Sequence, residues 1–135
     1  MAQKKKILVV DDEPYIVRVV QANLMVEGYE VVAAYDGLEA LQRLQEEKPD
    51  LVLLDVMMPE MDGWAVLERI RSNPETENLP VIMLTALAQD ADIERGTLLG
   101  CDVYITKPFE PRDLVNAVRR MLEGMEEERL LRGVG

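Results

Sequence analysis

Five short, mostly apolar runs alternate along this chain with longer stretches in which apolar residues recur every three or four positions. Short apolar runs are typical of buried strands, and the longer periodic stretches are typical of amphipathic helices. The expected strands cover residues 7–10, 30–34, 51–54, 81–84 and 103–106. This regular alternation predicts an α/β domain with a parallel sheet.

Local start and stop signals delimit the helices between the strands. Pro14 and Pro111 are tolerated in a first helical turn, whereas Gly28 and Gly100 are typical of helix ends. The expected helices begin at residues 14, 37, 64, about 91 and 111, and they end at Gly28, Glu47, Ser72, Leu99 and about Glu123. The chain therefore contains five strand–helix units.

Right-handed crossovers restrict such units to a few sheet topologies. Of the two common doubly wound orders we expect the flavodoxin-like order 2-1-3-4-5, with helices on both faces of a five-stranded parallel sheet in three α/β/α layers. A chain of 135 residues is long enough for one hydrophobic core, and no shift in composition suggests a second domain.

Polar side chains follow the strands at the points where they end. Asp11 and Asp12 follow the first strand, Asp55 follows the third, Thr85 the fourth and Lys107 the fifth. The carboxyl ends of parallel strands meet at one edge of the sheet, where open α/β sheets bind ligands. We therefore expect these five side chains to share one site.

Three carboxylates about 4 to 5 Å apart would repel each other by roughly 3 to 4 kcal/mol per pair at an effective dielectric constant near 20. A positive charge is expected among them, and ligands that are all oxygens favour a hard cation such as Mg²⁺. Lys107 supplies a second positive charge. A carboxylate that is aligned beside a metal and a lysine can attack phosphorus, and the Thr85 hydroxyl can donate to a phosphoryl oxygen.

Composition narrows the partners and the chemistry. The net charge is -11, from 15 Lys and Arg against 26 Asp and Glu, which disfavours direct binding to nucleic acid or to an anionic membrane.

The chain has no histidine, so any phosphohistidine donor must belong to another protein. The single cysteine, Cys101, excludes an internal disulfide and is expected to have a packing role. No apolar run resembles a signal peptide or a membrane span, and we expect a cytoplasmic protein.

These motifs closely resemble the receiver domain of two-component response regulators, which is CheY-like. The resemblance rests on DDEP at residues 11–14, LLDVMMPEMDG at 53–63, Thr85 with Ala86, and Lys107 with Pro108 and Phe109. It covers nearly the whole chain. We assign residues 1–124 to the receiver domain, and residues 125–135 to an acidic tail or the start of a linker that contains no output domain.

The resemblance implies a function and a role for each site residue. Asp55 would accept a phosphoryl group from a histidine kinase or phosphotransfer protein, and Lys107 would contact that group. Mg²⁺ would be bound by Asp11, Asp12 and Asp55 and by the backbone carbonyl of Met57. Such a domain promotes its own phosphorylation and dephosphorylation and is otherwise not an enzyme.

The resemblance also implies a switch. Thr85 would shift toward the phosphate and Tyr104 would rotate inward, which would remodel the face formed by the fourth helix, the fifth strand and the last helix for a downstream effector protein. The Lys107–Pro108 peptide bond would be cis. The kinase would contact the first helix and the loop after the fifth strand, and we expect Val17 beside Gln21 to leave part of the first helix accessible. Whether phosphorylation drives homodimer formation stays open.

Several alternatives compete with this interpretation. Asp11 and Asp12 could cap a helix, Asp55 could be a turn residue, Lys107 a surface residue, and Thr85 and Tyr104 ordinary strand residues. A flavodoxin-like electron carrier is disfavoured because acids occupy the place where a flavin phosphate would bind. A phosphatase of the haloacid dehalogenase type would resemble this chain only with a second acid two residues after Asp55, where Met57 stands. A phosphate-independent pseudo-receiver, and the excised N-terminal receiver of a larger DNA-binding or enzymatic regulator, stay open.

The residues two positions after Asp55 and Thr85 are Met57 and Leu87. In the family these positions influence the loss of the phosphoryl group. An apolar pair orients the attacking water poorly, so we expect slow self-dephosphorylation.

Overall fold

The structure is a computed structural model that describes residues 4–131. Its five strands form one sheet of order β2-β1-β3-β4-β5 in which every pair is parallel. They are β1 (Lys6–Val10), β2 (Glu30–Ala34), β3 (Leu51–Leu54), β4 (Val81–Thr85) and β5 (Val103–Thr106). The predicted flavodoxin-like order is confirmed, and Thr85 is the last residue of β4 rather than the first residue after it.

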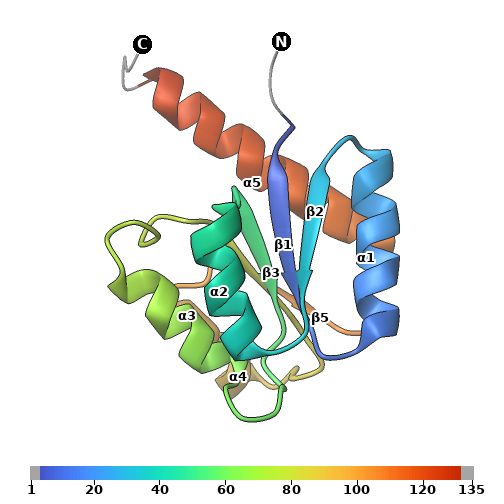
Figure 1. The fold of residues 1–135 in the computed structure, drawn as a ribbon, viewed down its shortest axis with the longest axis vertical. Coiled ribbons are helices and arrows are strands. Elements are labelled where there is room, and N and C mark those ends of the chain that lie inside the picture. The colour runs from blue at the N-terminus through green and yellow to red at the C-terminus, as the bar shows by residue number, and fades with distance from the viewer. Residues whose placement is uncertain (1–3, 132–135) are drawn as a thin grey trace.

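Within residues 4–131, five helices cover the sheet. Figure 1 shows their arrangement. They are α1 (Pro14–Val26), α2 (Gly37–Glu47), α3 (Gly63–Ser72), α4 (Asp90–Leu99) and α5 (Pro111–Leu131). One core holds buried side chains of α2 and α3 against the sheet, with Leu99 of α4 at its margin. A second core holds buried side chains of α1 and α5. The molecule therefore has the three α/β/α layers that the sequence predicts.

The two cores explain why the strands are apolar along their whole length. In β1, Leu8 and Val10 belong to the core of α2 and α3, whereas Ile7 and Val9 belong to the core of α1 and α5. Successive side chains of a strand point to opposite faces, and here both faces are covered by helices. An alternating polar pattern would leave polar groups in one of the cores.

Capping residues define the starts of α2 and α3 and the end of α4. The Asp36 carboxylate accepts from the Glu39 N–H (2.7 Å) at the start of α2, and the Asp62 carboxylate accepts from the Ala65 N–H (3.0 Å) at the start of α3. Such caps satisfy N–H groups that have no partner within the helix. Gly100 has a φ of +98°, which lets the chain turn out of α4.

The end of α5 differs from the sequence prediction. We expected this helix to end near Glu123, but it continues to Leu131, and its last turns extend away from the sheet (Figure 1). Gly124 alone does not end the helix, because the following residues include Glu, Arg and Leu, which are good helix formers. Residues 132–135 of the expected tail lie outside the described residues.

Val17 corrects a second expectation. Its side chain is 0% exposed and packs in the core between α1 and the sheet, so it cannot form an accessible kinase surface.

Cys101 is a free cysteine that packs, half-buried, against the core of α2 and α3, as expected. The Lys107–Pro108 bond is cis, also as expected. Among residues 4–131, no helix has the length and apolar character needed to cross a membrane.

Candidate functional site

The register of the sheet brings the acids together. Val10 of β1 pairs with Leu54 of β3, and the Asp55 N–H donates to the Val10 carbonyl (2.9 Å). The residues that follow these two strands, Asp11 and Asp55, therefore leave the sheet side by side. Asp12 follows one position later.

The three predicted acids form one cluster. Asp11, Asp12 and Asp55 each present a carboxylate oxygen, and these oxygens all lie within 4.8 Å of one another. Asp11 and Asp55 are only 2% and 4% exposed, whereas Asp12 is exposed to solvent. The expectation that the acids converge at one edge of the sheet is confirmed.

Lys107 reaches into this cluster from β5. Its Nζ lies 2.7 Å from Oδ2 of Asp11 and 3.6 Å from Oδ2 of Asp55. It also lies 3.5 Å from Oε1 of Glu13, a residue that the sequence analysis did not assign to the site. The signal for Glu13 was present, because it directly follows the two adjacent aspartates.

Burial and charge shift the pKa values of this cluster. Burial raises the pKa of Asp11, and it also raises the pKa of Asp55, where the charge of Asp11 adds to the effect. Lys107 partly offsets both shifts. For Lys107 burial acts to lower the pKa, but the hydrogen bond to Asp11 and the charge of Asp55 outweigh it and the pKa is raised. The cluster thus holds more negative charge than its lysine neutralises.

Thr85 and Tyr104 meet at a residue that the sequence analysis connected only with dephosphorylation. The Thr85 hydroxyl is fully buried, lowers the pKa of Asp55 and accepts from the Leu87 N–H (3.3 Å). The Tyr104 hydroxyl donates to the Leu87 carbonyl (2.8 Å). Burial, followed by the charge of Asp92, raises the pKa of Tyr104 to about 12. The backbone of Leu87 therefore lies between the two expected switch residues.

The loop after β3 folds back over the phosphoacceptor candidate. The Met57 N–H donates to Oδ1 of Asp55 (3.4 Å), while the Met57 side chain is exposed. A Cβ on Gly63 would lie 2.1 Å from the Asp55 carbonyl oxygen, so only glycine fits there. The sequence analysis missed Gly63, whose requirement comes from this close approach.

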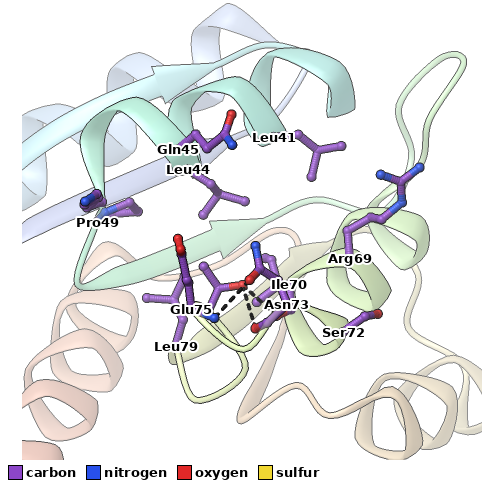
Figure 2. A pocket seen from close by; sticks show the side chains of 12 residues that line it. Leu41, Leu44, Gln45, Pro49, Arg69, Ile70, Ser72, Asn73, Glu75 and Leu79 are labelled. Carbon is purple, nitrogen blue, oxygen red and sulfur yellow. Dashed lines mark hydrogen bonds between the residues drawn. The ribbon is translucent and has the colours of Figure 1, made fainter.

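A pocket of about 750 Å³ lies at another part of the molecule, between α2, α3 and the loop after α3 (Figure 2). Its lining includes Leu41 and Leu44 of α2, Ile70 of α3, and Pro49, which precedes β3. It contains none of the predicted site residues. The chemistry predicted from the sequence therefore belongs to the acidic cluster and not to this pocket.

Comparison with known proteins identifies the family. The sequence model of the response regulator receiver domain matches residues 7–119. The chain belongs to this family. It is 49% identical over 127 residues to the probable transcriptional regulator ycf27 of Cyanophora paradoxa, a match that covers 94% of this chain and 52% of the relative.

Two further relatives agree. The alkaline phosphatase synthesis transcriptional regulatory protein PhoP of Bacillus subtilis (strain 168) is 47% identical over 122 residues, which cover 90% of this chain and 50% of PhoP. The crystal structure of a CheY-like response regulator receiver domain protein from Methanospirillum hungatei JF-1 matches with a TM-score of 0.87 and 33% identity, covering 93% of this chain and 99% of that one. The chain spans about half the length of the curated relatives.

The family defines the general function. The chain is a response regulator receiver domain of two-component signalling, a class of domain that interacts with histidine kinases and effectors. The curated relatives are named as regulators and not as enzymes.

Proposed function

We propose that Asp55 accepts a phosphoryl group from a histidine kinase or phosphotransfer protein. The observation that carries this proposal is the position of Asp55: a buried carboxylate at the end of β3, within 4.8 Å of two other acids and 3.6 Å from the Lys107 ammonium. A helix cap or an ordinary turn residue would not need this concentration of charge.

The transfer step follows from these contacts. A carboxylate oxygen of Asp55 attacks the phosphorus, and a new O–P bond forms while the bond from phosphorus to the donor's imidazole nitrogen breaks. The electron pair leaves with that nitrogen, which then takes up a proton. Lys107 and Thr85 flank Asp55, and each can donate a hydrogen bond to an oxygen of the incoming group.

The donor set of the cluster fits Mg²⁺. Asp11, Asp12 and Asp55 offer only carboxylate oxygens, and their mutual repulsion is relieved by a divalent cation. Together with the Met57 carbonyl, these residues would hold the ion. Bound Mg²⁺ neutralises the charge that builds up on the phosphoryl oxygens during transfer.

The same site would control an output face. We propose that phosphorylation draws Thr85 toward the phosphoryl group and changes the position of Tyr104, and so remodels the surface of α4, β5 and α5. The support is that both residues hydrogen-bond the backbone of Leu87. A movement of the loop after β4 would therefore reach Tyr104 directly.

Incubation with acetyl phosphate and Mg²⁺ tests the acceptor. We expect an acid-stable, base-labile adduct of one phosphoryl group on the natural protein and none on Asp55→Asn. Omission of Mg²⁺ should strongly reduce its formation. Absence of the adduct from the natural protein would support a phosphate-independent pseudo-receiver, and an adduct on Asp55→Asn would assign the reaction to another residue.

The output is proposed from the relatives. Those named as transcriptional regulators are about twice as long as this match, and α5 continues as a helix to Leu131. These observations favour a receiver that acts on an output domain or on a separate effector protein. An immunoblot of the source cells distinguishes a protein of the mass of this chain from one of about twice that mass.

A further inference from the structure

Gly96 lies in α4 directly against the ring of Tyr104. A Cβ at this position would lie 3.0 Å from Cδ2 and 3.1 Å from Cε2 of Tyr104, and 3.2 Å from Sγ of Cys101. Gly96 is the buried residue of α4, whose other residues are all at least partly exposed. Glycine is unfavourable in the interior of a helix, so its presence here needs a reason. The close approach of the aromatic ring supplies that reason.

The ring has little freedom to move away from a side chain at position 96. Its backbone lies in β5, where Tyr104 pairs with Met83 of β4, and its hydroxyl is held by the Leu87 carbonyl at 2.8 Å. Both ends of the residue are therefore fixed. A displacement of a few tenths of an ångström would lengthen or break the hydrogen bond, because the strand pairing holds the other end.

We propose that Gly96 is a positioning residue for the switch: its missing side chain allows the Tyr104 ring to lie against α4 and bond the loop after β4. This inference rests on the proposed function, because it concerns the residue that would transmit phosphorylation to the output face. A side chain at position 96 would weaken the hydrogen bond between Tyr104 and Leu87. Phosphorylation of Asp55 would then no longer change the position of Tyr104 against α4.

The chain offers a matched control in Gly124, the corresponding glycine of α5. A Cβ at Gly124 would meet no described heavy atom within 4 Å outside its own helix. Gly124→Ala should therefore raise the melting temperature through helix propensity alone. Gly96→Ala should lower the melting temperature of the natural protein, and should lower it less when combined with Tyr104→Ala, because the ring is then absent and only the contact with Sγ of Cys101 remains. An increase for Gly96→Ala in the presence of Tyr104 would overturn the proposal.

Fluorine NMR of 3-fluorotyrosine-labelled protein observes the ring itself, with the Tyr104 signal assigned by its loss in Tyr104→Phe. In Gly96→Ala we expect this signal to shift and to show a larger solvent isotope effect, while Gly124→Ala leaves it unchanged. An unchanged Tyr104 signal in Gly96→Ala would also overturn the proposal.

Acetyl phosphate with Mg²⁺ separates this inference from the proposed function. In Gly96→Ala, Asp55 should be phosphorylated by acetyl phosphate at a rate within about twofold of that in the natural protein. The Tyr104 signal should respond to phosphorylation only in the natural protein. A natural protein that is not phosphorylated, or whose Tyr104 signal does not respond, would contradict the proposed function, while the Gly96–Tyr104 contact would still be judged by the unphosphorylated spectra. An equal response in both proteins would overturn the role of Gly96.

Discussion

Burial at the carboxyl ends of β1 and β3 works against the two carboxylates that lie there. Asp11 and Asp55 are almost fully buried, and the pKa of each is raised because the charged form loses hydration. Lys107 is shared between them and does not neutralise both. At the scale of residues, the site therefore favours positive ligands at the expense of the stability of the fold.

The stability of the Asp55→Asn variant should measure how much the buried Asp55 carboxylate destabilises the fold. The raised pKa means that the folded state holds a proton at pH values where the unfolded state has lost it, so stability falls as pH rises through this range. At pH 7, without Mg²⁺, we expect Asp55→Asn to raise the free energy of unfolding by on the order of 1 kcal/mol. The gain should disappear below the ordinary carboxyl pKa of 3.8, where both states are protonated.

Urea unfolding at several pH values checks this prediction, with Asp12→Asn as the control. Asp12 belongs to the same cluster but is exposed, so solvent screens its charge and its replacement should give a smaller gain. A loss of stability in Asp55→Asn at pH 7 would contradict the argument.

A second prediction at this scale concerns the lifetime of the phosphoryl group. Met57 is exposed beside Asp55, and Leu87 is half-buried after β4, so neither supplies a polar group to orient an attacking water. The double variant Met57→Asn, Leu87→Glu should lose its phosphoryl group several-fold faster than the natural protein. The decay of the labelled adduct after removal of the donor measures this, and equal lifetimes would refute the idea.

At the scale of elements, one arginine at the end of α3 joins four segments. Arg71 donates from Nε to the Gly100 carbonyl (2.9 Å) at the end of α4, and from Nη1 to the carbonyls of Glu77 (3.0 Å) and Leu79 (2.6 Å) before β4. Its Nη2 bonds Asp102 (3.0 Å), which also accepts from the Val81 N–H (2.8 Å). These contacts align the beginnings of β4 and β5 and hold the end of α4.

Arg71→Ala should therefore destabilise the protein by about 2 kcal/mol, because it leaves three carbonyls and a carboxylate without their charged partner. Arg69→Ala is the matched control, since Arg69 lies on the same helix but is exposed and has no ion pair among residues 4–131. Its effect should stay within about 0.5 kcal/mol. Chemical denaturation of both variants decides the question, and equal effects would show that the Arg71 contacts contribute little.

At the scale of the whole molecule, the site depends on the assembly of all the strands from β1 to β5 into one sheet. Residues that are far apart in the sequence, such as Asp11 and Lys107, approach to 2.7 Å only when β1 and β5 are placed in the same sheet. An ion held by Asp11, Asp12 and Asp55 therefore binds the folded state alone. Binding of this kind stabilises the entire domain.

Mg²⁺ should accordingly raise the free energy of unfolding of the natural protein by about 1.4 kcal/mol at a concentration ten times its dissociation constant. Removal of the ion with EDTA should reverse the gain. Thermal unfolding with and without Mg²⁺ checks this. NaCl that is free of Ca²⁺ and has the same ionic strength is the control for non-specific screening of charges. In Asp12→Asn, the Mg²⁺ concentration that gives half of the maximal stabilisation should rise. If Asp12→Asn were stabilised at the same Mg²⁺ concentrations as the natural protein, the ion would bind elsewhere.

The sequence by itself determined the order and the type of the elements. The apolar runs and the helical periodicity depend on residues that are near each other in the chain, and the strand ends at Asp11, Asp55 and Lys107 could be located from them. The same local information predicted the acidic cluster, because parallel strands share one carboxyl edge. It was wrong at the end of α5, where continued helix propensity was underestimated.

The tertiary structure alone decided which side chains meet. The burial of Val17, the sharing of Lys107 between Asp11 and Glu13, the bonds of Arg71 and the contact of Gly96 with Tyr104 all join residues from different elements. Such contacts depend on the rotation and depth at which helices pack on the sheet, and these follow from the shapes of many side chains at once. A local pattern specifies that a face is buried, whereas only the packed molecule specifies what that face touches.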